Sequence, residues 1–173
     1  YSLEKIKSIS SLISSNETAN NEIEENNILL ALAASAEKGS EHPLGEAIVR
    51  AAIEKNIELK SLENFNAIPG HGIEVVIENE SILLGNLKLM KERSIDIGEL
   101  RGEADRLANE GKTPMFIAIN NSLEGIIAVA DTVKPSSINA IKELHNMGIK
   151  VAMITGDNKK TAEAIAKQVG IDI

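Results

Sequence analysis

The spacing of apolar residues changes twice along this chain, and the changes divide it into stretches that must fold differently. From Ile28 to Ala52, apolar side chains recur at helical spacing, and from Leu62 they alternate in the manner of half-buried strands. Beyond residue 125, continuous apolar runs alternate with helical patterns, which is typical of a doubly wound α/β unit. The sequence therefore predicts an α+β part joined to a fragment of an α/β part.

The first of these stretches has the pattern of a helical hairpin. Helices are expected at 28–38, ending at Gly39, and from Pro43 onward, because glycine commonly follows a helix and proline suits its first position. Residues 16–27 carry acids and asparagines without Lys or Arg, so a solvated connector or a helix lead-in is expected there. Residues 1–13 alternate loosely and are compatible with a strand.

The alternation after Leu62 predicts an antiparallel sheet with helices between some of its strands. The expected elements are strands 62–68, 72–78 and 81–84, helices 87–91 and 99–109, and strands 114–120 and 123–130. The C-terminal part is expected to hold buried parallel strands at 125–130 and 149–154 and helices at 135–147 and 158–169. Two strands cannot complete a doubly wound sheet, so further strands are expected from outside this chain or from residues 1–13.

Charge and composition exclude several classes of function. The net charge of −8 and the pI near 5.0 argue against a nucleic-acid binder and a polybasic membrane-surface module, because both need a basic face. The absence of cysteine excludes a disulfide scaffold, thiol catalysis and a thiolate metal site. The longest apolar stretch, residues 28–36, is about half of the roughly 20 residues that a membrane-spanning helix needs, so no membrane segment is expected.

Two polar segments follow expected strands in the C-terminal part. The first is TGDN, with Thr155, Gly156 and Asp157, and the second is ADTVKP, with Asp131 and Lys134. At the carboxyl end of a strand and before a helix, such residues are placed to meet a phosphoryl oxygen. Ordinary helix capping beside a solvated lysine explains the same patterns, so both interpretations stay open.

The segment SEHP (40–43) forms a tight elbow between the two N-terminal helices, one helical turn after Glu37. The Glu37 carboxylate and the His42 imidazole can converge there. A carboxylate accepts from the exocyclic amine of adenine and would repel the oxygen that guanine carries at that place. The alternative is a histidine N-cap beside a surface glutamate. A metal site is disfavoured because His42, His71 and His145 are far apart in the sequence.

Glycines mark two further candidate segments. Gly70 and Gly72 in PGHGI enter an expected strand, and Gly85-Asn86 follows another. Such glycines let a backbone approach a flat ring or adopt positive φ. A glycine-bearing turn is the alternative for both segments, and no Walker A, nucleophile-elbow or zincin motif accompanies them.

The order of these segments is more specific than any one of them. Glu37 is followed by SEHPL (40–44), PGHGI (69–73), LGNLKLM (84–90), EGKTPMFIA (110–118), VADTVKP (129–135) and MITGDN (153–158). Over residues 28–173 this series resembles the motif series of heavy-metal P-type ATPases. Its detail is most similar to the copper(I) branch, with zinc, cadmium and cobalt pumps as the alternative.

The resemblance implies an α+β nucleotide-binding domain, an antiparallel sheet flanked by helical hairpins. This domain would be inserted in a partial α/β phosphorylation domain of the haloacid dehalogenase-like, Rossmann type. The expected domains are 1–13 (partial phosphorylation domain or connector), 14–126 (nucleotide-binding domain) and 127–173 (partial phosphorylation domain).

The resemblance also implies that the chain binds ATP, with Mg²⁺ taking part in the intact pump. The residues expected to line the adenine pocket are Glu37, His42, Gly70, Gly72, Ile73, Gly85 and Asn86. The residues expected near the phosphates and Mg²⁺ are Asp131, Lys134, Thr155, which would hold the transferred phosphoryl group, Gly156 and Asp157. The expected partners are ATP or ADP and the remaining phosphorylation, actuator and membrane domains, with no nucleic acid. The chain would then be a cytoplasmic domain of an integral protein of the cell membrane.

Two family boxes are absent from this sequence: DKTGT, which carries the phosphorylated aspartate, and GDGxND, which binds Mg²⁺. The chain is therefore expected to bind ATP without turnover, as a fragment of a pump that hydrolyses ATP to translocate a metal ion. One rival interpretation is a complete phosphatase of the haloacid dehalogenase type, against which the missing aspartate box counts. The other is a noncatalytic interaction module, against which the intact Glu37, His42, Gly70 and Gly72 count.

Overall fold

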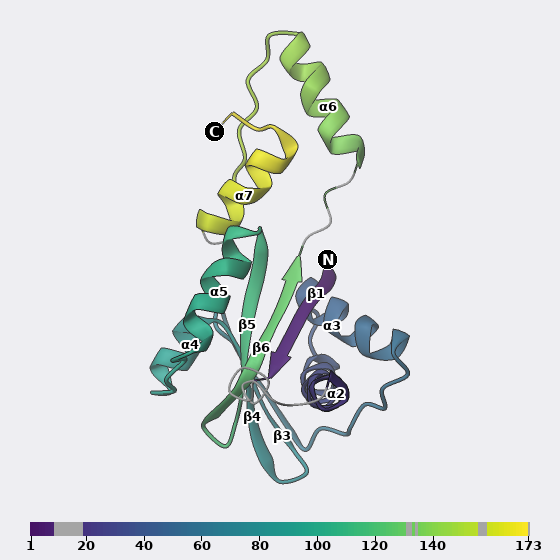
Figure 1. Ribbon diagram of the computed structural model, residues 1–173, viewed down its shortest axis with the longest axis vertical. Helices are drawn as coiled ribbons and strands as arrows, with labels where there is room; N and C mark the ends of the chain where they lie inside the picture. Colours follow the sequence, from purple (N-terminus) through teal and green to yellow (C-terminus); the bar gives the residue numbers. More distant parts are fainter. Residues whose placement is uncertain (9–18, 131–132, 134, 156–158, 173) are drawn as a thin grey trace.

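A six-stranded sheet forms the centre of the computed structural model, which describes residues 1–8, 19–130, 133, 135–155 and 159–172. The strand order is β1-β6-β5-β4-β3-β2 (Figure 1). The strands are β1 (Ser2–Ser8), β2 (Asn64–Ile68), β3 (Gly72–Ile77), β4 (Glu80–Gly85), β5 (Lys112–Ile119) and β6 (Ser122–Ala130). All adjacent strands run antiparallel, which confirms the α+β architecture.

Helices cover both faces of this sheet (Figure 1). They are α2 (Ala19–Glu37), α3 (Pro43–Glu54), α4 (Leu87–Glu92) and α5 (Leu100–Asn109). The α2–α3 hairpin packs on one face and α4 with α5 on the other. In β6, Ile127 and Val129 join the core under α2 and α3, whereas Ile126 and Ala128 join the core under α4 and α5. Each face of the sheet therefore has its own hydrophobic core.

The prediction of a buried parallel strand at 125–130 is wrong. These residues belong to β6, which pairs antiparallel with β5 on one side and with β1 on the other, where Ser2 lies opposite Ala130. The N-terminal strand is therefore an edge of this same sheet and supplies nothing to a parallel one. The run is continuously apolar because helices cover both faces of a central antiparallel strand.

The expected strand at 149–154 is also wrong. The segment forms no strand, and Ile149 and Ile154 are 45% and 100% exposed. Among the described residues no strand lies beside it, so a strand here would leave its backbone N–H and C=O groups without ladder partners. The two expected C-terminal helices are present as α6 (Pro135–Asn146) and α7 (Lys159–Val169).

The helix α2 begins earlier than the expected helix at 28–38. It starts at Ala19, which confirms the helix lead-in, and not the connector, for residues 19–27. Glu22 in its first turn is favourable beside the helix N-terminus. Gly39 does not adopt positive φ, so it is not a left-handed C-terminal cap. The end of α2 is closed instead by a tighter turn, in which the Ser40 N–H donates to the Glu37 carbonyl at 2.9 Å.

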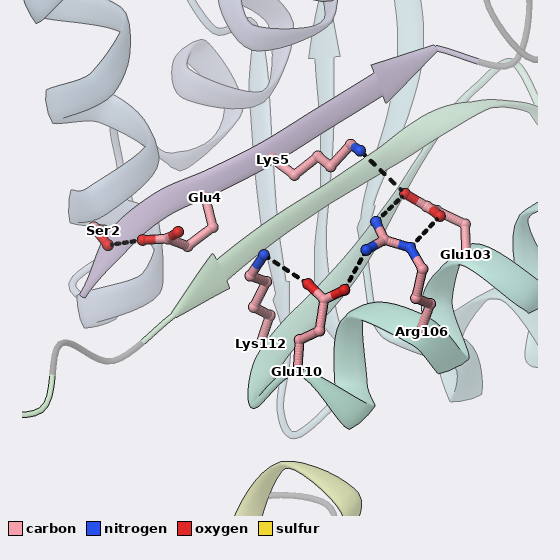
Figure 2. Close-up of polar contacts among 7 residues, drawn as sticks. All are labelled: Ser2, Glu4, Lys5, Glu103, Arg106, Glu110 and Lys112. Carbon is pink, nitrogen blue, oxygen red and sulfur yellow. Dashed lines mark hydrogen bonds and ion pairs between the residues drawn. The ribbon is translucent and has the colours of Figure 1, made fainter. Parts of the chain in front are cut away.

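A chain of ion pairs joins β1, α5 and β5 (Figure 2). Arg106 donates to both carboxylate oxygens of Glu103 at 2.8 and 2.9 Å, and Nζ of Lys5 lies 3.6 Å from the same carboxylate. Arg106 also contacts Glu110, whose other oxygen accepts from Nζ of Lys112 at 2.9 Å. The hydrogen bonds from Arg106 lower the pKa of Glu103 to about 2.

The expected domain boundaries at residues 13 and 126 stay a prediction. β6 passes residue 126 without a break, and β1 pairs along it from residue 2 to residue 8. The sheet thus contains strands from all three expected domains.

Candidate functional site

The elbow between α2 and α3 places an acid and a histidine on successive helices. Glu37 is the last residue of α2, and His42 is the N-cap of α3, where its Nδ1 accepts from the Leu44 N–H at 3.2 Å. Pro43 occupies the first turn, as expected. Because Nδ1 is an acceptor, the neutral ring carries its proton on Nε2. The capping role and a ligand-binding role for His42 are therefore compatible, since they use different nitrogens.

Glu37 is a buried carboxylate, only 5% exposed. Its Oε2 atom has no hydrogen-bond partner among the described residues. Burial raises the pKa of Glu37, while a hydrogen bond from Ser40 and the charge of a protonated His42 act in the opposite direction. A buried acceptor without a donor is costly, so this oxygen is suited to a donor supplied by a ligand, such as an exocyclic amine.

Gly45 in α3 makes room for that carboxylate, and the sequence analysis missed it. A Cβ atom at position 45 would lie 2.3 Å from Oε2 and 2.9 Å from Cδ of Glu37. The available signal was a glycine near the start of an otherwise regular helix, where alanine is more stable by roughly 0.5–1 kcal/mol. Such a glycine predicts that another group packs closely against the helix, but it does not identify that group.

Gly70 and Gly72 have different roles in the β2–β3 turn. Both have positive φ, at 72° and 147°. A Cβ on Gly72 would lie 2.2 Å from the Leu84 carbonyl oxygen, so this glycine is required for the close approach of β3 and β4. A Cβ on Gly70 would meet nothing within 4 Å among the described residues. Of these two glycines, Gly70 is the one with open space beside its backbone, where there is room for a flat ring.

Gly85 and Asn86 hold this turn in place. A Cβ on Gly85 would lie 2.3 Å from the His71 carbonyl oxygen. The Asn86 Nδ2 donates to the Gly70 carbonyl at 2.8 Å, and the Asn86 N–H donates to the His71 carbonyl at 2.9 Å. Its Oδ1 accepts from the Lys88 N–H as the N-cap of α4. Asn86 thus has protein partners at both ends of its amide, which favours a positioning role over direct contact with a ligand.

Ile73, which was expected to line the adenine pocket, is a residue of the hydrophobic core. It follows Gly72 in β3, is 6% exposed, and belongs to the same hydrophobic cluster as Ala33 and Ala36 of α2. The structure thus gathers Glu37, His42 and Gly45 at the elbow and Gly70, Gly72, Gly85 and Asn86 at the turn. Whether all of them line one pocket stays a prediction.

The residues expected near the phosphates are largely outside the described part of the chain. Asp131, Lys134, Gly156 and Asp157 all lie outside the described residues. Thr155 is described, and it is exposed at the end of the segment that follows α6. The predicted phosphate-binding roles of these residues therefore stay predictions.

Among the described residues, no group of three or more His, Asp or Glu side chains is arranged to hold a metal ion. The described histidines outside the elbow have other partners, since His71 lies beside Glu92 and His145 beside Asp172. None of the helices described above is both long and apolar enough to cross a membrane.

Comparison of the sequence with known proteins gives consistent matches. A family model described as a haloacid dehalogenase-like hydrolase matches residues 12–173. Copper-exporting P-type ATPases from Staphylococcus aureus strains JH9 and MRSA252 are 56% and 57% identical to this chain over 147 and 144 residues. The matches cover 84% and 83% of this chain, which spans only 18% of the length of each relative.

Comparison of the structure leads to the same group of proteins. The crystal structure of a zinc-transporting PIB-type ATPase in an E2.Pi state matches with a TM-score of 0.71 and 29% identity, over 98% of this chain and 25% of that chain. The N-domain of HMA8, a copper-transporting P-type ATPase, matches with a TM-score of 0.57 and 22% identity, over 75% of this chain and 100% of that chain. At that identity the second likeness concerns the fold alone.

Proposed function

Because the chain belongs to the haloacid dehalogenase-like hydrolase family, and within it resembles the heavy-metal P-type ATPases, we propose that it is the ATP-binding part of such a pump. In this role it holds the adenine of ATP and directs the γ-phosphate towards an aspartate outside this chain. The single observation that carries the proposal is the buried Oε2 of Glu37 beside the α2–α3 elbow, which lacks a hydrogen-bond partner among the described residues.

Adenine fits the chemistry of this elbow. Its exocyclic amine donates a hydrogen bond, which the Glu37 carboxylate accepts. His42 is an exposed residue whose capping bond uses Nδ1 and not Nε2. Gly70 supplies an open backbone surface for the ring system. Guanine has an oxygen where adenine has the amine, so the Glu37 carboxylate repels it.

The phosphates contribute little to affinity in this proposal. The chain has a net charge of −8, so long-range attraction of an anionic nucleotide is unfavourable. We assign the phosphate side to Thr155, Gly156, Asp157, Asp131 and Lys134 of the intact pump, where Mg²⁺ neutralises the phosphates.

Copper(I) is the proposed transported ion. The copper-exporting relatives at 56% and 57% identity support it, whereas the zinc-transporting structure at 29% identity supports the alternative of a zinc, cadmium or cobalt pump. The proposed location is cytoplasmic, with the actuator, membrane and remaining phosphorylation domains of the parent pump as partners.

Titration calorimetry with ATP, ADP, AMP and GTP tests the proposal. We expect the three adenine nucleotides to bind within about three-fold of one another, because the base supplies the recognition, and GTP to bind at least about ten-fold more weakly. In amide NMR spectra, ATP should shift the signals of Glu37, His42 and Gly70. A strong preference for ATP over AMP, or shifts centred on Thr155, would overturn the adenine site.

A further inference from the structure

His71 in the PGHG turn is held at both nitrogens of its ring. Its Nδ1 lies 2.8 Å from the carbonyl oxygen of Pro69, and its Nε2 lies 3.2 Å from Oε1 of Glu92 in α4. A carbonyl and a carboxylate are both acceptors, so the two contacts are hydrogen bonds at the same time only when both nitrogens carry protons. The doubly protonated ring therefore fits this position best.

The turn is consequently tied to both ends of one short helix. Asn86, the N-cap of α4, donates to the carbonyls of Gly70 and His71. Glu92, the last residue of α4, reaches the His71 ring. The turn is therefore held by Asn86 at the start of α4 and by Glu92 at its end.

We propose that His71 and Glu92 form a latch that holds the Gly70–Gly72 turn in its nucleotide-binding shape, and that protonation of His71 closes the latch. The inference rests on the proposed adenine site at Gly70. His71 is a positioning residue here, because it acts through the backbone of the turn and not on the nucleotide.

Among the charged residues around the turn, Glu92 is the one that contacts the His71 ring. The other charged residues on α4, just after it and on the adjoining strands are Lys88, Lys91, Arg93, Glu74 and Glu80. Arg93 donates to both oxygens of Glu74, at 2.7 and 3.3 Å, so these two side chains pair with each other. The described β2 carries no charged residue.

Adenosine is the probe that separates the latch from the phosphates. It has the base without a phosphate that titrates near neutral pH, so its affinity between pH 6 and pH 8 reports on the protein. The wild-type chain should bind adenosine about two- to five-fold more tightly at pH 6 than at pH 8, which is the scale of one exposed ion pair. Glu92→Gln should remove most of this dependence, because the neutral amide no longer forms an ion pair with a protonated His71.

Two substitutions of His71 test its two ring contacts separately. His71→Gln keeps an amide donor in place of Nε2, towards Glu92, and His71→Asn keeps one in place of Nδ1, towards Pro69. Both should lose the pH dependence, and His71→Gln should retain more of the affinity measured at pH 6. Arg93→Gln is the matched control, because it breaks the adjacent Arg93–Glu74 pair and leaves the latch intact. Its affinity and pH profile should equal those of the wild type.

The outcomes separate the latch from the adenine site. No adenosine binding by the wild-type chain at any pH would overturn the adenine site itself. Binding with the same pH profile in the wild type and in Glu92→Gln would overturn the latch alone. Glu92 is 59% exposed, so its substitution should leave the melting temperature unchanged, and this variant decides the test even if the His71 variants fail to fold.

Discussion

The carboxylate of Glu37 lies directly against the backbone of Gly45, where an added Cβ atom would stand 2.3 Å from Oε2. Gly45 is in the first turn of α3, and glycine in a helix costs roughly 0.5–1 kcal/mol relative to alanine. The helix therefore gives up stability to admit the buried acid. A ligand that binds to the Glu37 carboxylate accounts for glycine at position 45.

Gly45→Ala should lower both stability and nucleotide affinity. The added methyl group must displace the Glu37 carboxylate or the start of α3, which typically costs about 1–3 kcal/mol. We expect urea denaturation to show a loss in this range and calorimetry to show ATP affinity reduced about ten-fold or more. The control is Gly102→Ala in α5, where an added Cβ meets nothing within 4 Å. It should stabilise the chain by about 0.5–1 kcal/mol, and an equal gain at Gly45 would contradict the prediction.

Glu37→Gln should stabilise the chain at neutral pH. Burial raises the pKa of Glu37 above its unfolded value of 4.5, so the wild type loses stability as pH rises from that value through the folded pKa. Glutamine is neutral throughout, so the variant should be more stable than wild type by about 1 kcal/mol at pH 7, and the difference should vanish at pH 4. Urea denaturation at both pH values checks this, with Glu41→Gln on the exposed side of the elbow as the control.

The same substitution should relax nucleotide selection. A glutamine amide both donates and accepts, so it no longer repels the guanine oxygen. The ratio of ATP to GTP affinity should fall in Glu37→Gln. A variant that is less stable at pH 7 and equally selective would mean that Glu37 has a structural role only.

Hydrophobic spacing predicted most of the elements of this fold but not all of their pairings. The alternation was sufficient in β3, where fully buried residues alternate with partly exposed ones. It failed at 125–130, since Ile126 and Ile127 are both buried by helices on opposite faces of an antiparallel sheet. A strand covered on both faces has the same pattern whichever way its neighbours run.

Residue spacing supplied the candidates for the site, which stay a prediction, but not the contacts that these residues make. Glu37 and His42 were identified because a carboxylate and an imidazole one elbow apart suit a base. The positioning role of Asn86 and the space made by Gly45 depend on contacts with residues distant in sequence, Gly70 and Glu37 respectively. The spacing of residues along the sequence does not show which distant residues come into contact.

The ion-pair chain around Glu103 should make stability dependent on acid pH. Hydrogen bonds from Arg106 lower the pKa of Glu103 to about 2, so its contribution is complete above its ordinary value of 4.5 and is lost as pH falls towards 2. Glu103→Gln should cost about 1 kcal/mol at pH 7, a value reduced from the full pKa shift because solvent screens the partly exposed pairs, and little at pH 2.

Denaturation of the two proteins at pH 7 and at pH 2 measures that difference. Glu99→Gln is the matched control, because Glu99 precedes the same helix and makes no capping hydrogen bond through its side chain. A destabilisation of Glu103→Gln that is the same at both pH values would show that packing, not charge, is the role of this side chain.

Asn86→Asp should separate the two functions of the Asn86 amide. Aspartate keeps the oxygen that accepts from Lys88 and Leu89 at the start of α4, and its charge is favourable there, so the melting temperature should be unchanged. It loses the donor to the Gly70 carbonyl and places a carboxylate beside that oxygen instead. The turn should therefore shift, and ATP affinity should fall by about three- to ten-fold. Asn86→Ala, which loses both bonds, should lower affinity and also cost about 1 kcal/mol of stability. If Asn86→Asp binds ATP as tightly as the wild type, the bond to Gly70 does not position the turn.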